Sequence, residues 1–145
     1  MADVKLHWAQ AEHNRGLMLA LSSCTPIVYR DWVVIVGFYA AVHYVEARLA
    51  TEPEGHSDGR AGAHRFRLDM VSKYYGNSAI KAYRKLYRTS LILRYLVAYD
   101  PSTQTTRCAA EAAGAWLDDY VVRTSFLKAV DTIKTETQAS LDGLI

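Results

Sequence analysis

The stretch from Phe38 to Ala50, "FYAAVHYVEARLA", decides the fold and raises the main question about a site. It belongs to an apolar segment that begins after Asp31, a residue type that favours the start of a helix. Because the segment is apolar nearly all the way round, we expect residues 32–50 to form the central, most buried helix. Within it, His43 and Glu46 stand three positions apart and therefore project from one face.

Helical spacing and chain breakers divide the remaining sequence. The segment 4–23 is expected to be a helix, because Leu6, Ala9, His13 and Leu17 recur at helical intervals. No window alternates apolar and polar residues as a half-buried strand does. We therefore predict an all-α fold, a single domain over 1–145 built as an up-and-down bundle of four to six helices. The further helices are expected over 63–74, over 79–98 and from Pro101 to about Thr137 with a kink near 122–125, with a loop over 51–62 and a frayed tail over 138–145.

Composition excludes several classes of protein. Half of the 145 residues are apolar and the net charge is only +2, which is typical of a soluble globular domain and does not by itself favour a nucleic-acid binder. No uncharged apolar run is long enough to cross a bilayer, and the first residues lack the pattern of a secretory signal, so we expect a cytoplasmic protein with no membrane partner. The sequence has no phosphate-binding glycine loop, dinucleotide fingerprint or serine-hydrolase elbow.

The helix expected over 79–98 concentrates positive charge. Four basic residues share one side of this helix, and the opposite side is apolar. Arg94 lies near the middle of that apolar side. A guanidinium cannot lose its proton to avoid the cost of burial, so Arg94 needs a partner, either a carboxylate such as Glu46 or an anionic ligand. One side of the helix is either a solvated face or a surface that follows phosphates, and it is formed by Lys81, Arg84, Lys85 and Arg88.

Two interpretations of His43 and Glu46 remain open. In the first, they satisfy each other, or His43 bonds a carbonyl or a tyrosine hydroxyl while Glu46 pairs with an arginine. In the second, the stretch "RAGAHRFR" brings Arg60, His64 and Arg67 onto one helical stripe, and the five residues line an anion pocket. A metal site made of His43, Glu46 and His64 would lack the repeated Glu-x-x-His pattern of di-iron bundles, so neither a metal nor a cofactor is predicted.

Four pieces of the sequence occur in a familiar order: "AEHNRGLM", "DWVVIVGFYAAVHYVEARLA", "HRFR" and "YRKLYRTSLILRY". This order resembles the HEPN superfamily of helical bundles, in particular its small stand-alone bacterial members. The most specific parts are Asp-Trp, Phe-Tyr-Ala-Ala-x-His and Ser-x-x-x-Arg-Tyr. The resemblance implies a bundle that often dimerises. It also implies either metal-independent RNA cleavage, as in toxins and defence proteins, or non-catalytic binding of nucleotides or RNA.

One departure from that family bears on catalysis. The ribonuclease members carry an arginine, four to six further residues and then a histidine. Here Arg60 precedes His64 by three intervening residues and Arg48 precedes His56 by seven, so the motif is absent. If the protein cleaves RNA, the catalytic candidates are His64 and Arg67, a base and a cationic stabiliser in the opposite order.

The sequence thus predicts, first, a HEPN-like module that binds a nucleotide, RNA or another phosphate-bearing ligand in a polar pocket inside the bundle, and forms a homodimer. The first alternative is a metal-independent ribonuclease of a toxin–antitoxin or defence system. The second is a non-catalytic bundle that binds a partner protein. The arginines would supply charge while His43 and Glu46 orient them. The predicted ligand-binding residues are His43, Glu46, Arg60, His64, Arg67 and Arg94.

Overall fold

The computed structural model describes residues 2–57, 59–95, 98–100, 102, 104–107 and 116–145. The predicted all-α class is confirmed, and the described residues add one short hairpin to it. The elements are α1 (Ala2–Ser22), α2 (Arg30–Leu49), α3 (Ala63–Tyr74), α4 (Asn77–Tyr95), β1 (Ala98–Asp100), β2 (Thr105–Arg107), α6 (Asp119–Val121), η1 (Val122–Leu127) and α7 (Lys128–Ser140).

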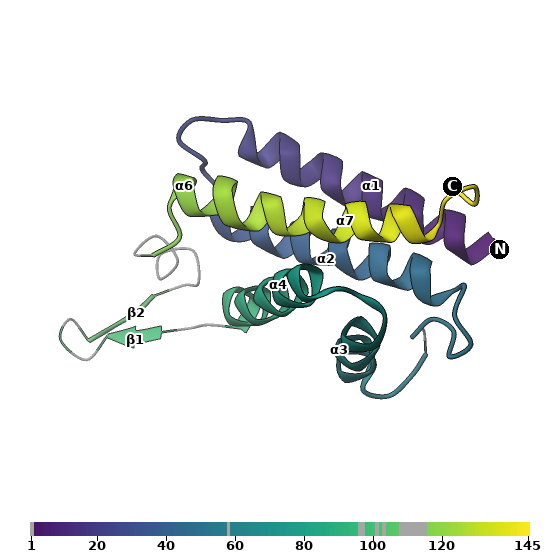
Figure 1. Ribbon diagram of the computed structural model, residues 1–145. Coiled ribbons are helices and arrows are strands. Elements are labelled where there is room, and N and C mark those ends of the chain that lie inside the picture. Colours follow the sequence, from purple (N-terminus) through teal and green to yellow (C-terminus); the bar gives the residue numbers. More distant parts are fainter. Residues whose placement is uncertain (1, 58, 96–97, 101, 103, 108–115) are drawn as a thin grey trace.

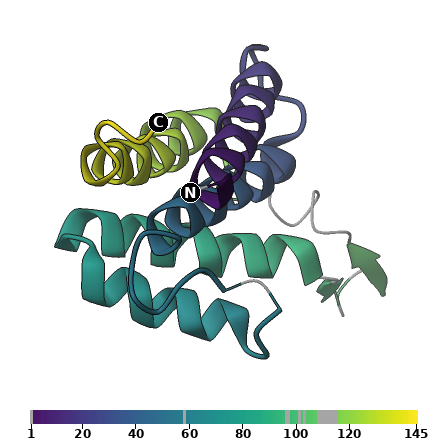
Figure 2. The same ribbon diagram turned by 90° about the vertical axis from the view of Figure 1, so that its right-hand side faces the viewer.

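Helix α2 is the centre of the bundle, as predicted. It contacts α1, α3, α4, η1 and α7. Figures 1 and 2 show α1 on one side of α2 and the pair α3 and α4 on the other, with α3 on the outer side of α4. By length and composition α2 could cross a membrane, but most of it is buried inside the bundle, which favours the core helix of a soluble protein.

Helix α1 forms where it was predicted but turns a different face to the core. Val4, Ala11 and Met18 are buried, whereas Leu6 and Leu17, which the spacing placed on the apolar face, are exposed. Apolar residues stand on more than one side of this helix, so helical spacing alone could not select the buried face. This difference matters for the site, because His7, which the sequence did not single out, lies beside the buried face of α1.

The C-terminal third corrects one prediction and confirms another. The helix expected from Pro101 does not begin there, because Ala98–Asp100 pairs in antiparallel fashion with Thr105–Arg107, and the helix expected over 79–98 is wrong at Ala98 for the same reason. The helical structure expected up to about Thr137 is confirmed over Asp119–Ser140. Thr105 and Thr106 are β-branched, a residue type that favours strands. The predicted alanine-rich helical stretch over 108–115 lies outside the described residues. Helical regularity changes where the kink was predicted near 122–125, since η1 is a π-helical segment between α6 and α7.

The chain end differs from the frayed tail expected over 138–145. Helix α7 continues to Ser140, and Leu141 is fully buried in a small cluster with Val4 and Ala47. Burial of an apolar side chain at the end of the helix fixes the tail to α1 and α2. The two termini therefore lie at the same end of the bundle (Figure 1).

Candidate functional site

Glu46 of α2 lies at the centre of the site and is 1% exposed. Its Oε1 accepts a hydrogen bond from Arg67 Nη1 at 2.9 Å and another from the Ser57 hydroxyl, while its Oε2 accepts from the Ser57 amide at 2.8 Å. Burial raises the pKa of Glu46, but the hydrogen bonds from Ser57 and the charge of Arg67 outweigh it and hold the pKa below its ordinary value. Glu46 is therefore a buried carboxylate that pairs with an arginine, as the first interpretation of this residue predicted.

Arg67 of α3 connects that carboxylate to the neighbouring groups. It is 7% exposed, and its Nη1 also donates to Ser57 Oγ at 2.6 Å. Its Nη2 lies 3.0 Å from His64 Nδ1, and because a guanidinium can only donate, the imidazole nitrogen accepts. Tyr83 of α4 is buried next to this guanidinium, and burial raises the pKa of its hydroxyl to about 12.

His64 lies at the half-buried edge of this cluster. Its ring centroid is 5.6 Å from that of Tyr87 and 6.1 Å from that of Phe38. Burial, together with the positive charges of Arg67 and Arg94, holds the pKa of His64 below its ordinary value. The imidazole is therefore neutral at neutral pH, and because its Nδ1 accepts from Arg67, its Nε2 carries the proton.

Arg94 does not pair with Glu46, which the sequence had offered as its internal partner. Its Nη1 donates to the Tyr39 hydroxyl at 2.9 Å, its Nε donates to the Ser90 carbonyl at 3.3 Å, and the guanidinium lies over the rings of Phe38 and Tyr39. Arg94 thus joins two of the most specific sequence pieces, Phe-Tyr-Ala-Ala-x-His on α2 and Ser-x-x-x-Arg-Tyr on α4. It is half-buried, and hydrogen bonds and aromatic faces satisfy its charge.

Arg60 stands apart from the other predicted residues. Helix α3 begins at Ala63, so Arg60 lies in the preceding loop and not on a helical stripe with His64 and Arg67. Its guanidinium donates to the Glu54 carbonyl and lies 4.3 Å from the centre of the Phe66 ring. Of the predicted residues, the structure brings Glu46, His64 and Arg67 together.

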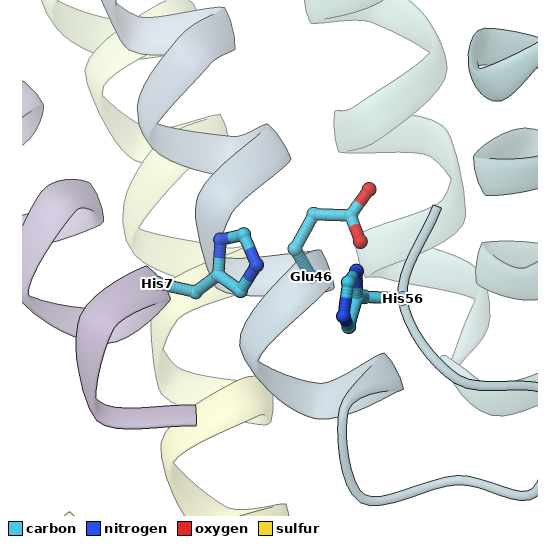
Figure 3. Close-up of side chains that lie close together, drawn as sticks. All are labelled: His7, Glu46 and His56. Carbon is cyan, nitrogen blue, oxygen red and sulfur yellow. The ribbon is translucent and has the colours of Figure 1, made fainter. Parts of the chain in front are cut away.

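A second group of side chains meets Glu46 from the other direction. Figure 3 shows His7 of α1, Glu46 of α2 and His56 of the following loop converging. One nitrogen or oxygen of each lies within 4.8 Å of the others. His43 belongs to this group, because its Nδ1 is 3.1 Å from His7 Nδ1. Asp3 borders it as well, since His56 Nε2 is 3.6 Å from Asp3 Oδ2. The sequence did not single out His7 and His56, because helical spacing relates residues within one helix, whereas these two belong to α1 and to a loop.

The basic stripe of α4 borders a groove. Helix α4 carries five lysines and arginines and no acidic residue. Between α3 and α4 lies a cavity of about 440 Å³. Arg84 lines it, and its Nη2 donates a hydrogen bond to Ser72 Oγ at 3.2 Å. We call this cavity the α3–α4 groove, and it is lined by Arg65, Leu68, Asp69, Ser72, Arg84, Tyr87 and Arg88.

Comparison with known proteins gives no relative. No family model, no curated protein and no solved structure matches this chain. The likeness to HEPN bundles therefore stays a prediction from the four sequence pieces.

Proposed function

We propose that this chain is a HEPN-like helical module that binds RNA, a nucleotide or another phosphate-bearing ligand through the α3–α4 groove. The observation that carries this proposal is the set of three arginines, Arg65, Arg84 and Arg88, around one cavity. All three are exposed, and a guanidinium fork matches the oxygens of a phosphate. Tyr87 lines the same groove and offers an aromatic face on which a base can stack.

The pocket predicted inside the bundle is a weaker candidate for the phosphate. Arg67, its central cation, is buried and neutralised by Glu46 at 2.9 Å. An anion placed there would have to displace a buried carboxylate or lie next to it, and both arrangements are costly. The groove also holds a carboxylate, Asp69, which pairs with Arg65 at 3.4 Å, but both side chains are exposed, so an anion that enters there does not strip a buried carboxylate of its partner. His64 remains relevant, since its ring borders Tyr87 at the edge of the groove.

The proposal is tested by binding of a labelled single-stranded RNA, followed by fluorescence anisotropy in the presence of a chelator. If three arginines neutralise about three phosphates, the affinity should fall about 20-fold as the salt rises from about 50 to about 200 mM. The double variant Arg84→Ala/Arg88→Ala should bind at least about 10-fold more weakly and should have a shallower salt dependence.

The matched control removes the same charge elsewhere. Lys5 of α1 and Lys128 of α7 are exposed, and the double variant Lys5→Ala/Lys128→Ala should retain most of the affinity. The proposal fails if neither RNA nor nucleotides bind at low salt. It also fails if the control loses as much affinity as the groove variant, since the attraction would then come from the net charge alone.

A metal-independent ribonuclease is the second candidate, and one observation favours it. A neutral His64 beside the Arg67 guanidinium, at the edge of the groove, pairs an imidazole with a cation, and the imidazole would act as a base once its Nδ1 is released from Arg67. Cleavage of RNA by the wild type in the presence of a chelator, absent in His64→Ala and retained in His13→Ala, would support it. Intact RNA in the wild-type reaction would leave binding without catalysis.

The remaining expectations belong to this proposal. They are a homodimer, a cytoplasmic location and a role in a toxin–antitoxin or defence system with a partner protein. Sedimentation equilibrium of the purified chain tests the homodimer directly. A monomer at micromolar concentration would remove it from the proposal.

A further inference from the structure

We propose that His7, Glu46 and His56 form a binding site for a divalent transition-metal ion, with Zn²⁺ as the best fit. The proposal does not depend on the groove. It rests on the cluster in Figure 3, where three side chains from three separate elements lie close together. Those atoms lie within 4.8 Å of one another, although the residues are up to 49 positions apart in the sequence.

The donor set selects the class of ion. Two imidazole nitrogens and one carboxylate oxygen suit Zn²⁺ and its transition-metal neighbours, whereas Ca²⁺ and Mg²⁺ prefer oxygen donors throughout. Bonds of about 2.1 Å to a tetrahedral Zn²⁺ would hold the donors about 3.4 Å apart. The donors of His7, Glu46 and His56, which lie within 4.8 Å of one another, would therefore have to close by up to about 1.4 Å. Both histidines are only half-buried, so side-chain rotation can supply that movement.

Each donor already has the kind of neighbour that orients a metal ligand. A ligating histidine commonly holds a hydrogen-bond partner at its other ring nitrogen, and a ligating carboxylate is hydrogen-bonded in turn. His7 Nδ1 lies 3.1 Å from His43 Nδ1, within hydrogen-bond distance, and His56 Nε2 faces Asp3 Oδ2 at 3.6 Å, a separation that has to shorten to give a hydrogen bond. Glu46 is held by the Ser57 amide at 2.8 Å and by Arg67.

Three protein ligands leave the coordination of a tetrahedral ion incomplete. His43 is a candidate for the fourth ligand, because its Nδ1 lies 3.1 Å from His7 Nδ1 and it stands on the same face of α2 as Glu46, one turn earlier. Either His43 completes a four-ligand structural site or a water molecule takes the fourth position, as in catalytic zinc sites. The charge permits either arrangement. The charged groups around the proposed ion would be two carboxylates, those of Glu46 and Asp3, and one guanidinium, that of Arg67.

The test uses tag-free full-length protein that has been stripped of metal with a chelator and then titrated with Zn²⁺ against a chromophoric competitor. We expect one ion per chain and a rise in melting temperature that depends on Zn²⁺ concentration. Co²⁺ in place of Zn²⁺ should give the intense visible absorption of a tetrahedral site. His7→Ala and His56→Ala should each weaken binding by more than about 100-fold.

The chain offers a matched control in another histidine. His13 is exposed on α1 and stands outside the cluster of His7, Glu46 and His56, so His13→Ala should bind Zn²⁺ like the wild type. His56 lies in a loop, so His56→Ala keeps the test valid if His7→Ala disturbs α1; circular dichroism checks both folds. Absence of stoichiometric binding by the wild type would overturn the proposal. Equal loss in His13→Ala would do the same, because it would show that the ion binds scattered surface histidines.

Discussion

Replacing Arg67 with methionine should destabilise the protein by about 3 kcal/mol, because it leaves the Glu46 carboxylate buried without its counter-charge. The two side chains are 9% and 2% exposed, so water cannot replace the guanidinium. Removing one partner of a buried pair costs about 3–5 kcal/mol, and we expect the lower end since Ser57 still donates to both carboxylate oxygens. For a chain of this length the melting temperature should fall by about 6–12 °C.

A double-mutant cycle separates the ion pair from the loss of packing. Glu46→Gln removes the charge on the other side, and the double variant Glu46→Gln/Arg67→Met should be about 1–3 kcal/mol more stable than the sum of the single effects predicts. Urea unfolding followed by circular dichroism at neutral pH, with a chelator present, gives each free energy. Arg65→Met is the control on the same helix: its side chain is 83% exposed, and the cost should stay below about 0.5 kcal/mol. A cost for Arg67→Met below about 1 kcal/mol, or additive single effects, would refute the reasoning.

Two further predictions follow from the same packing. Because the pKa of Glu46 is held below its ordinary value of 4.5, its contribution to stability is complete above that pH and is lost as the pH falls through the lowered pKa. Urea unfolding at a series of pH values should therefore show a steeper acid loss in the wild type than in Glu46→Gln. Gly37→Ala should cost about 1–3 kcal/mol, because the added Cβ would stand 2.8 Å from Met18 Sδ and 3.2 Å from Val130 Cγ2 between packed helices. Gly16→Ala meets nothing within 4 Å and should instead stabilise α1 by up to about 1 kcal/mol, so the two thermal melts should shift in opposite directions.

The fold was predictable where chain breakers and hydrophobic pattern agreed. The apolar run that became α2 and the bounds of Ala63–Tyr74 follow from the sequence because loops rich in glycine and proline stand beside them. The region after Tyr95 was not predictable in the same way. The alanine-rich stretch that follows it suggested a helix, but propensity is a weak prior, and pairing between β1 and β2 overrides it at Thr105–Arg107.

The site was predictable only in part, and the reason is topological. Helical spacing placed His43 next to Glu46 and His64 next to Arg67, and the demand of a buried carboxylate for a cation predicted the ion pair. Spacing could not identify the arginine that pairs with Glu46, because the pairing depends on how α3 and α4 lie against α2. Ser57 and His56 were hidden for the same reason, since a loop residue has no face to read from the sequence.

The two proposed sites share no residue, which allows the same variants to separate them. The groove holds its ligand through Arg84 and Arg88, whereas the ion would be held by His7, Glu46 and His56. Arg84→Ala/Arg88→Ala should therefore lose RNA and keep Zn²⁺, while His56→Ala should lose Zn²⁺ and keep RNA. If one variant lost both ligands while its circular dichroism stayed unchanged, the ion and the RNA would have to meet in a single site. The placement of the phosphate in the α3–α4 groove would then be wrong.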